Sequence, residues 1–244
     1  MALKAQPRGF DLDTEPAHHG PLTDFQGPTM PVTDATDAEL VLYTHPWSRG
    51  QIARWMLEEV GRPYRQVLLD FGSTMKAPDY LALNPLGKVP TVVHRGQVVT
   101  ECAAICAYLA DAFPAAGLAP APAERAAYYR WLFFAAGPLE AAIIDRTLKV
   151  ELTPRQEVMA GYGSYERAVE VIADAVSTGP YVAGPGFTAA DVYVGSHLIW
   201  GMQFGTLPKR PEFEDYAARL VARPAYTAAK AIDEALGQAL QAKG

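Results

Sequence analysis

The stretch NPLGKVPTVV, residues 84–93, constrains the fold more than any other part of the chain. Pro90 stands directly before a Val-rich apolar run, and a proline, which has no N–H, belongs at the first position or the edge of a strand. After a Gly-Lys turn, a proline in this place predicts a cis bond between Val89 and Pro90. Such a bond turns the backbone N–H and C=O of Val89 outward, where they can pair with an extended peptide. The alternative is an ordinary trans proline on an edge strand.

Strands and helices alternate around this stretch. Apolar runs predict buried strands, a stripe at helical spacing predicts an amphipathic helix that ends at Gly61, and Arg95-Gly96 between two Val-rich runs predicts a tight hairpin. The predicted elements are a strand at 39–43, a helix at 48–60, a strand at 64–69, a helical piece at 77–83, a hairpin at 90–100 and a helix at 101–113. This β-α-β-α-β-β-α order predicts an α/β domain over residues 39–113, with a mixed sheet and helices on its faces.

The second half of the chain carries no strand pattern. Residues 114–123 have the composition of a linker, and helices are predicted at 124–150, 154–177, 188–202, 211–222 and 225–242. The fold class is therefore α/β plus all-α, with an all-helical domain over 124–244. A cleft between two domains of unlike class is the default place for a ligand. Residues 1–38 are rich in Pro, Gly, Asp and Thr and are predicted to be an extension, flexible or draped over the body.

The composition excludes several classes of function. Half of the residues are apolar and the formal net charge is −6, which argues against a nucleic-acid surface. No window approaches the ~18 uninterrupted apolar residues of a membrane span, and the first residues show no signal-peptide core. Cys102 and Cys106 lie four residues apart in a predicted helix, a spacing that does not suit a structural disulfide. Because disulfides are rare in the cytosol, we expect a cytoplasmic protein. His18 and His19 have no further ligands beside them, and we expect no metal.

Two predicted helix starts carry polar side chains that suit an anion. Ser48 stands where the first helix begins, and Glu101 and Cys102 begin the last helix of the first domain. Backbone N–H groups at such an end bind carboxylates, a small polar side chain assists them, and Glu101 can receive an ammonium group. The alternative is purely structural, with Ser48 as a helix cap and Glu101 placed to favour the helix dipole.

Taken together, these features resemble the thioredoxin-fold domain of the cytosolic glutathione transferases. The resemblance rests on LNPLGKVP followed by a hairpin and TECAAI, and it extends over residues 39–242. GFTAADVYVG, residues 186–195, resembles the buried capping box of that family. In such a box Thr188 caps a helix, and Asp191, three residues later, pairs back with Thr188. RWLFFAAGPLE, residues 130–140, resembles the bacterial members.

The resemblance implies roles for single residues. Glutathione would be the co-substrate, its cysteinyl backbone paired with Val89 beside Pro90. Its γ-glutamyl end would meet Glu101 and Cys102, Lys88 would approach the glycyl carboxylate, and Trp47 would form a wall of the glutathione site. The thiol would be stabilised as a thiolate by Ser48, or alternatively by Tyr43 at the end of the first strand. A thiol of pKa ~8.5 is mostly protonated at neutral pH, so a lowered pKa would expose the nucleophile.

The implied activity is conjugation of glutathione to small apolar electrophiles, with a role in detoxification, in a homodimer without metal. An aromatic stripe on the first long helix, Tyr128, Trp131 and Phe134, is either core packing or one side of the pocket for the second substrate. Cys102 stands where the family usually has serine, and a thiol is a weaker donor than a hydroxyl. Two alternatives follow: a non-catalytic binding or interaction protein on the same scaffold, and a glutathione-dependent redox enzyme that uses Cys102.

Overall fold

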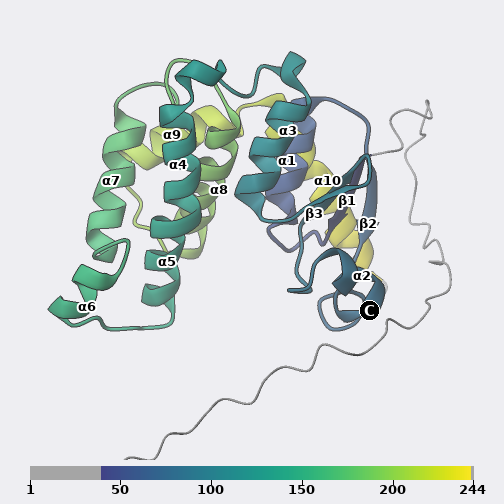
Figure 1. Cartoon of the computed structure of the whole chain (residues 1–244), viewed down its shortest axis with the longest axis horizontal. Coiled ribbons are helices and arrows are strands. Elements are labelled where there is room, and N and C mark those ends of the chain that lie inside the picture. Colours follow the sequence, from purple (N-terminus) through teal and green to yellow (C-terminus); the bar gives the residue numbers. More distant parts are fainter. Residues whose placement is uncertain (1–39, 243–244) are drawn as a thin grey trace, which may run out of the picture.

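The computed structural model describes residues 40–242 (Figure 1). The extension predicted for residues 1–38, with His18 and His19, lies outside this range. In Figure 1 a sheet with its covering helices forms one half of the described chain, and a group of helices forms the other half. The predicted α/β plus all-α architecture is confirmed.

Four strands build a mixed sheet in the spatial order β2-β1-β3-β4. β1 pairs parallel with β2 and antiparallel with β3, and β3 pairs antiparallel with β4. Arg95 and Gly96 have φ values of 51° and 73°, the left-handed conformation that a two-residue hairpin turn requires, so the predicted hairpin is confirmed. The bounds of the strands are β1 Leu40–Thr44, β2 Arg65–Leu68, β3 Thr91–His94 and β4 Gln97–Val99.

Helices cover both faces of this sheet. Alternate residues of β1 point to opposite faces, so Leu42 lies in the main core with α1 and α3, whereas Tyr43 lies in a small cluster with Tyr80 of α2. α1 begins two residues later than predicted, because residues 45–48 form a turn closed by the bond from the Ser48 N–H to the His45 carbonyl (3.1 Å). The bounds are α1 Gly50–Val60, α2 Pro78–Leu83 and α3 Cys102–Ala112, with a 3-10 turn at Thr74–Lys76.

The rest of the described chain is helical. Short 3-10 turns at Pro114–Ala116 and Pro122–Glu124 occupy the segment predicted as a linker. The helices are α4 Ala126–Phe134, a π-helical turn at Ala135–Leu139, α5 Glu140–Thr147, α6 Pro154–Met159, α7 Tyr165–Ser177, α8 Ala189–Phe204, α9 Pro211–Val221 and α10 Pro224–Gln241. Among residues 40–242 every helix is too short or too polar to cross a membrane.

Two of the predicted helices are interrupted. The one predicted over 124–150 passes through the π-helical turn that contains Pro138, which lacks the N–H for an ordinary helical bond. The one predicted over 154–177 is two helices, α6 and α7, because Gly163 between them has φ 70°. The prediction of one continuous helix was therefore wrong in the second case.

α8 lies at the centre of the helical half and begins with the predicted capping box. The Asp191 carboxylate accepts hydrogen bonds from the Thr188 backbone N–H (2.8 Å) and hydroxyl (2.9 Å), from the Val182 N–H (2.8 Å) and from the Tyr216 hydroxyl (2.7 Å). All of these groups are buried. The box therefore fixes the start of α8 to α9 and to the loop before it.

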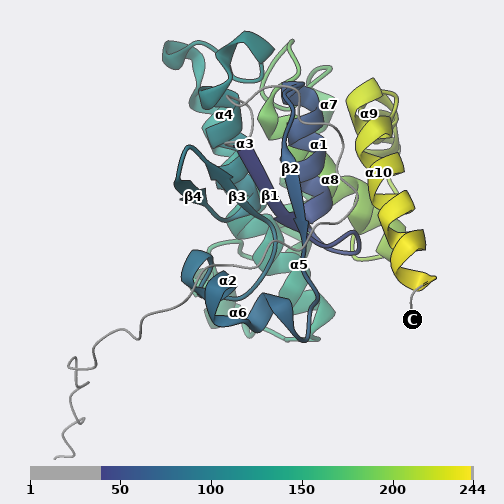
Figure 2. The same ribbon diagram turned by 90° about the vertical axis from the view of Figure 1, so that its right-hand side faces the viewer.

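The last helix, α10, returns to the first half of the chain and packs along α1 (Figure 2). A fully buried ion pair joins Arg54 of α1 to Asp233 of α10, with 2.9 Å between Nε and Oδ1. A second pair, 2.7 Å, joins Glu59 to Arg223 just before α10. These two pairs fasten the middle and the end of α1 to the last helix.

Candidate active site

Ser48 lies in the turn before α1, and its side chain is partly exposed. Its hydroxyl donates to the His45 carbonyl (2.6 Å), while its oxygen accepts the N–H of Gly50 (3.0 Å). The oxygen is therefore fixed by the first N–H of α1, and only the hydrogen has to turn for Ser48 to donate to a ligand. This geometry serves the capping role and the thiolate-binding role with the same atom.

The backbone approaches β1 closely just after Ser48. A Cβ atom at Gly50 would lie 1.9 Å from Oγ1 of Thr44, a fully buried residue at the end of β1. It would also lie 3.0 Å from the Ser48 hydroxyl oxygen. Only glycine lets the first turn of α1 lie this near to the strand, and that contact sets the position of Ser48.

Tyr43 occupies a different environment from Ser48. It pairs with Val67 and Thr91 in the sheet, and its ring packs on Tyr80 of α2, with 5.7 Å between ring centroids. Because Leu42 points toward α1, its neighbour Tyr43 points to the other face. The Tyr43 ring therefore packs in the cluster under α2, whereas Ser48 lies in the turn before α1.

The loop before β3 contains the predicted cis bond between Val89 and Pro90. Val89 is half-buried, Pro90 is buried and Lys88 is exposed. The Lys88 carbonyl accepts hydrogen bonds from the Tyr80 hydroxyl and from the Asn84 side-chain amide (2.8 Å). These bonds tie the loop to α2 and leave the Lys88 ammonium group at the surface.

Glu101 and Cys102 lie where α3 begins, as the sequence predicted. Glu101 is exposed and has φ 64°, a backbone conformation that is uncommon for residues other than glycine and that clusters at functional sites. The Cys102 thiol donates to the backbone carbonyl of Arg49 over 3.8 Å, so the starts of α1 and α3 meet. Burial raises the pKa of the Cys102 thiol to about 12, which keeps it protonated at neutral pH and weighs against the redox alternative.

Trp47 closes the other side of the turn. Its side chain is 54% exposed, and its ring stands 5.3 Å from the His45 ring. A Cβ at Gly237 of α10 would lie 2.9 Å from the Trp47 ring nitrogen, so the indole packs on a glycine of the last helix. The turn with Ser48 therefore lies between α10 and the start of α3.

Beside Ser48, a cluster of charged side chains that was not predicted from the sequence joins the two halves of the described chain. Arg49 pairs with Oε1 of Glu140 on α5, and the other oxygen, Oε2, lies 3.2 Å from Nε2 of His197 on α8. Burial opposes ionisation of Glu140, yet the bond from His197 and the charge of Arg49 outweigh it and lower the Glu140 pKa to about 2. Arg49 and Glu140 are 91 positions apart, so no local pattern could reveal them.

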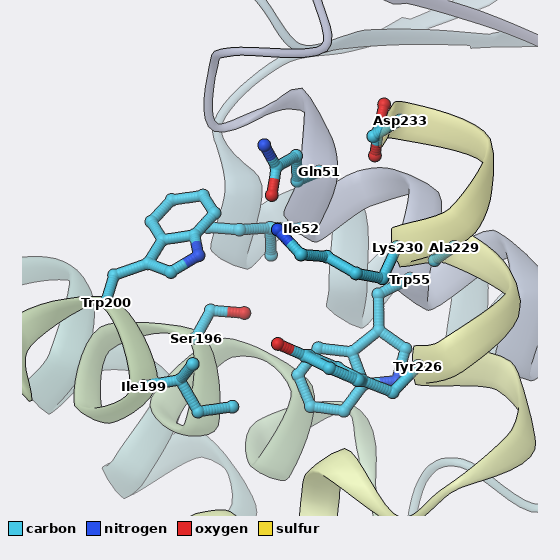
Figure 3. Close-up of a pocket in the computed structure, with 10 residues that line it drawn as sticks. All are labelled: Gln51, Ile52, Trp55, Ser196, Ile199, Trp200, Tyr226, Ala229, Lys230 and Asp233. Carbon is cyan, nitrogen blue, oxygen red and sulfur yellow. The ribbon is translucent and has the colours of Figure 1, made fainter. Parts of the chain in front are cut away.

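An aromatic hollow lies between α1, α8 and α10 (Figure 3). Figure 3 shows Trp200 and the Lys230 side chain pointing into it from opposite helices. Its lining consists of Gln51, Ile52, Trp55, Ser196, Ile199, Trp200, Tyr226, Ala229, Lys230 and Asp233. Gln51 belongs to the first turn of α1 and donates to the Pro46 carbonyl, so the hollow adjoins the turn that holds Ser48.

The aromatic stripe that was predicted to be either core packing or a pocket wall takes part in the main core. Tyr128 and Trp131 are buried in the main core, and Phe134 packs half-buried against it, with 5.6 Å between the Trp131 and Phe134 ring centroids. The burial of Tyr128 and Trp131 thus supports the interpretation of the stripe as core packing. Within the described part of the chain, no three His, Cys, Asp or Glu side chains are grouped as a metal site would need.

Comparison with known proteins agrees with this arrangement. The family described as "Glutathione S-transferase, N-terminal domain" matches residues 38–111. "Glutathione S-transferase GST-4.5" of Xanthomonas campestris pv. campestris is 32% identical over 173 residues, which are 67% of this chain and 83% of the relative. "Glutathione S-transferase 3" of Zea mays is 28% identical over 78% of this chain and 92% of its own length.

Solved structures show the same relationship. The crystal structure of a glutathione transferase from Methylococcus capsulatus superposes with a TM-score of 0.66 at 28% identity, over 80% of this chain and 98% of that one. A sphingomonad glutathione S-transferase complexed with glutathione gives 0.65 at 27% identity, with the same coverage of both chains. The chain therefore belongs to the glutathione S-transferase family and is a transferase enzyme of that family.

Proposed function

We propose that the chain binds glutathione beside Val89 and the start of α3, ionises its thiol at Ser48 and transfers the thiolate to small electrophiles. The observation that carries the proposal is the meeting of two helix starts at one partly exposed hydroxyl. Cys102 of α3 contacts the Arg49 carbonyl, and Arg49 directly follows Ser48. Two positive helix ends and a hydroxyl donor favour a thiolate over a thiol.

Ser48 is preferred over Tyr43 as the partner of the thiolate. The Ser48 oxygen is fixed by the Gly50 N–H at the start of α1, on the side where α3 also begins. Tyr43 packs on Tyr80 in the cluster under α2. A thiolate near the helix starts would have Ser48 within reach, whereas Tyr43 would have to leave its packing.

Glutathione in this site would lie along the loop before β3. The resemblance assigns Val89 and Pro90 to its cysteinyl part, Lys88 to a carboxylate, and Glu101 with Cys102 to its γ-glutamyl end. The exposed Lys88 and the exposed Glu101 in its unusual conformation support this assignment. Trp47 would border the site on the side of α10.

We further propose a homodimer in the cytoplasm. α4 exposes Tyr129 and Phe133, which is 70% exposed, and Figure 2 shows α4 and the edge strand β4 on the same side of the molecule. Sedimentation that gives a monomer at micromolar concentration would contradict the dimer. Cys102 and Cys106 are both free thiols, which fits a reducing compartment, and cell fractionation tests that location.

Calorimetric titration with glutathione near pH 7, in two buffers of different ionisation enthalpy, tests the proposed activity. We expect heat that depends on the buffer, because binding to this site releases the thiol proton. Turnover of glutathione with a small electrophile should accompany it.

Other outcomes point to the alternatives. Binding without proton release would indicate a glutathione-binding protein without a thiolate site, and no binding would indicate an interaction protein. A mixed disulfide on Cys102 after incubation with oxidised glutathione, detected by intact mass, would indicate the redox enzyme.

A further inference from the structure

His45 is a buried, titratable side chain in the turn that holds Ser48, and the proposed function does not use it. The residue directly follows β1 and is only 5% exposed. Residues 45–48 form the turn that leads into α1. Because Ser48 is the proposed partner of the thiolate, an inference about His45 rests on the proposed function.

The backbone of His45 closes this turn. Its carbonyl accepts the Ser48 N–H (3.1 Å) and the Ser48 hydroxyl (2.6 Å). A bond from the fourth residue back to the first closes a β-turn, and Pro46 stands at the second position, where proline is favoured. The position of Ser48 therefore depends on the conformation of the turn that begins at His45.

The ring of His45 closes the same turn a second time. Its Nδ1 accepts the backbone N–H of Trp47 over 3.2 Å. A side-chain acceptor that binds the N–H two residues later is the arrangement of an Asx turn, here made by an imidazole. To accept this bond, Nδ1 must carry no proton, so the ring must be neutral with its hydrogen on Nε2.

Aromatic contacts hold the ring in this orientation. The centroid of the His45 ring lies 4.3 Å from that of Phe71, in the loop after β2, and 5.3 Å from that of Trp47. The Trp47 indole in turn packs on Gly237 of α10. The loop after β2 and the last helix thus keep Nδ1 directed at the Trp47 amide.

The surroundings of the ring also keep it neutral. Burial lowers the pKa of His45 below its ordinary value of 6.5, and the charge of Asp70 opposes this in part. Among the described residues, Asp70 is the charged group that acts on the ring, whereas Trp47 and Phe71 carry no charge. Because the pKa is lowered, the acceptor is present above pH 6.5 and is lost as the pH falls through the lower value.

We propose that His45 is a positioning residue of the thiolate site, whose neutral ring holds the Trp47 amide and so keeps the turn in the conformation that presents the Ser48 hydroxyl to the thiol of glutathione. Protonation of Nδ1 replaces the acceptor with a donor that faces the Trp47 N–H, and the turn opens. His45 acts through Ser48 and not by contact with the reacting sulfur. The site then works at neutral pH and is switched off in acid.

Two variants separate the acceptor from the aromatic packing. His45→Asn keeps an acceptor for the N–H two residues later but loses the ring contacts, whereas His45→Phe keeps a ring and loses the acceptor. In His45→Phe we expect the pKa of the bound glutathione thiol, followed by ultraviolet absorption, to rise by about one unit. At pH 6 kcat/KM with a small electrophile should then fall about tenfold, since the thiolate fraction falls by that factor. In His45→Asn we expect the thiol pKa to stay within about 0.3 units of that of the unaltered protein.

The pH profile gives a second readout, which a merely structural role would not change. In the unaltered protein both the thiol and His45 titrate on the acid side, whereas in His45→Asn only the thiol does. We therefore expect kcat/KM of the unaltered protein to fall more steeply below pH 6.5 than that of His45→Asn. Parallel profiles would overturn the inference, and this comparison decides the matter if His45→Phe does not fold.

His94→Phe is the matched control. His94 is also buried, but it pairs with Leu40 at the opposite end of β1, and its Nδ1 bonds to the Tyr108 hydroxyl at 2.9 Å. The variant removes a bonded ring nitrogen away from the turn, and we expect the pKa of the bound thiol to be that of the unaltered protein. An unchanged thiol pKa in His45→Phe, or an equal rise in His45→Phe and His45→Asn, would overturn the inference.

The unaltered protein separates this inference from the proposed function. If its bound thiol has a lowered pKa that His45→Phe leaves low, the role of His45 is wrong and the proposed function stands. If the bound thiol of the unaltered protein titrates near the free value of about 8.5, no thiolate site exists and both are wrong.

Discussion

At the scale of single residues, the candidate site depends on the close approach of α1 to β1. Thr44 is fully buried, and its Oγ1 has no hydrogen-bond partner in the part of the chain that the structure describes. Gly50 lies against it, and the Gly50 N–H holds the Ser48 oxygen at 3.0 Å. The position of the Ser48 hydroxyl therefore depends on Gly50, two residues later, having no side chain.

Gly50→Ala tests this contact. A Cβ 1.9 Å from Thr44 Oγ1 cannot be accommodated, so the first turn must shift, and we expect a loss of about 1–3 kcal/mol in the free energy of unfolding together with weaker thiolate formation. Denaturant unfolding and calorimetry measure the two effects. Thr44→Ala in the same chain should restore most of both, because it removes the clashing oxygen.

Gly72→Ala is the control, since nothing lies within 4 Å of a Cβ built there. We expect a change within about 0.5 kcal/mol. If Gly50→Ala were as stable as the unaltered protein and ionised glutathione equally well, the close approach would not position Ser48.

Single residues were predictable where the chemistry is local. The place of Pro90 before a Val-rich run predicted the cis bond, and the small polar residues at two helix starts predicted where Ser48 and Cys102 lie. Arg49 and Glu140 could not be paired in the same way, because the π-helical turn and the packing of α8 decide where Glu140 points.

At the scale of elements, the start of α8 carries the best-satisfied polar group of the described chain. Both oxygens of Asp191 are buried and accept two hydrogen bonds each, which join the loop at Val182 and the α9 residue Tyr216 to the cap. The sequence predicted this box because Thr188 and Asp191 stand three apart before an apolar run.

Asp191→Asn should destabilise the whole fold. The amide keeps the shape but turns one acceptor into a donor that faces the N–H and O–H groups now bonded to Asp191. We expect a loss on the order of 3 kcal/mol in denaturant unfolding. Asp174→Asn, an exposed aspartate on α7, is the control and should change the free energy of unfolding by less than about 0.5 kcal/mol. A loss below about 1 kcal/mol for Asp191→Asn would mean that the box contributes little to folding.

Helix boundaries were less predictable than the helices themselves. Gly61 at φ 68° ended α1 as expected, since glycine before proline is a strong local stop. Gly163 also has a positive φ, but no proline follows it closely, and α6 and α7 were predicted as one helix. The π-helical turn around Pro138 depends on the packing of neighbouring helices, which spacing does not encode.

At the scale of the whole molecule, contacts between distant segments hold the site together. The Arg54–Asp233 and Glu59–Arg223 pairs fasten α10 to α1, and the Arg49–Glu140–His197 cluster fastens α1 to α5 and α8. The start of α1 is thus the point at which both halves of the described chain meet. These long-range contacts are the part of the site that could not be predicted from the sequence.

The Glu140 contacts predict a pH dependence of stability. The folded-state pKa, about 2, is below the ordinary value of 4.5, so the stabilisation is fully present above pH 4.5 and is lost as the pH falls toward 2. We expect the free energy of unfolding of the unaltered protein to be roughly 2 kcal/mol larger than that of Glu140→Gln at pH 7. This difference should shrink below pH 4.5. Denaturant unfolding of both proteins between pH 7 and pH 3 measures it. A difference that stays constant over this range would contradict the assigned pairing of Glu140 with Arg49 and His197.

Titration of the thiolate of bound glutathione with pH, followed by ultraviolet absorption, tests directly whether Ser48 stabilises that thiolate. We expect the pKa of the bound thiol to be at least about one unit below the free value of about 8.5, to return toward that value in Ser48→Ala and to stay low in Tyr43→Phe. A low pKa that persists in Ser48→Ala, or that is lost in Tyr43→Phe, would contradict the claim and would assign the thiolate to another residue.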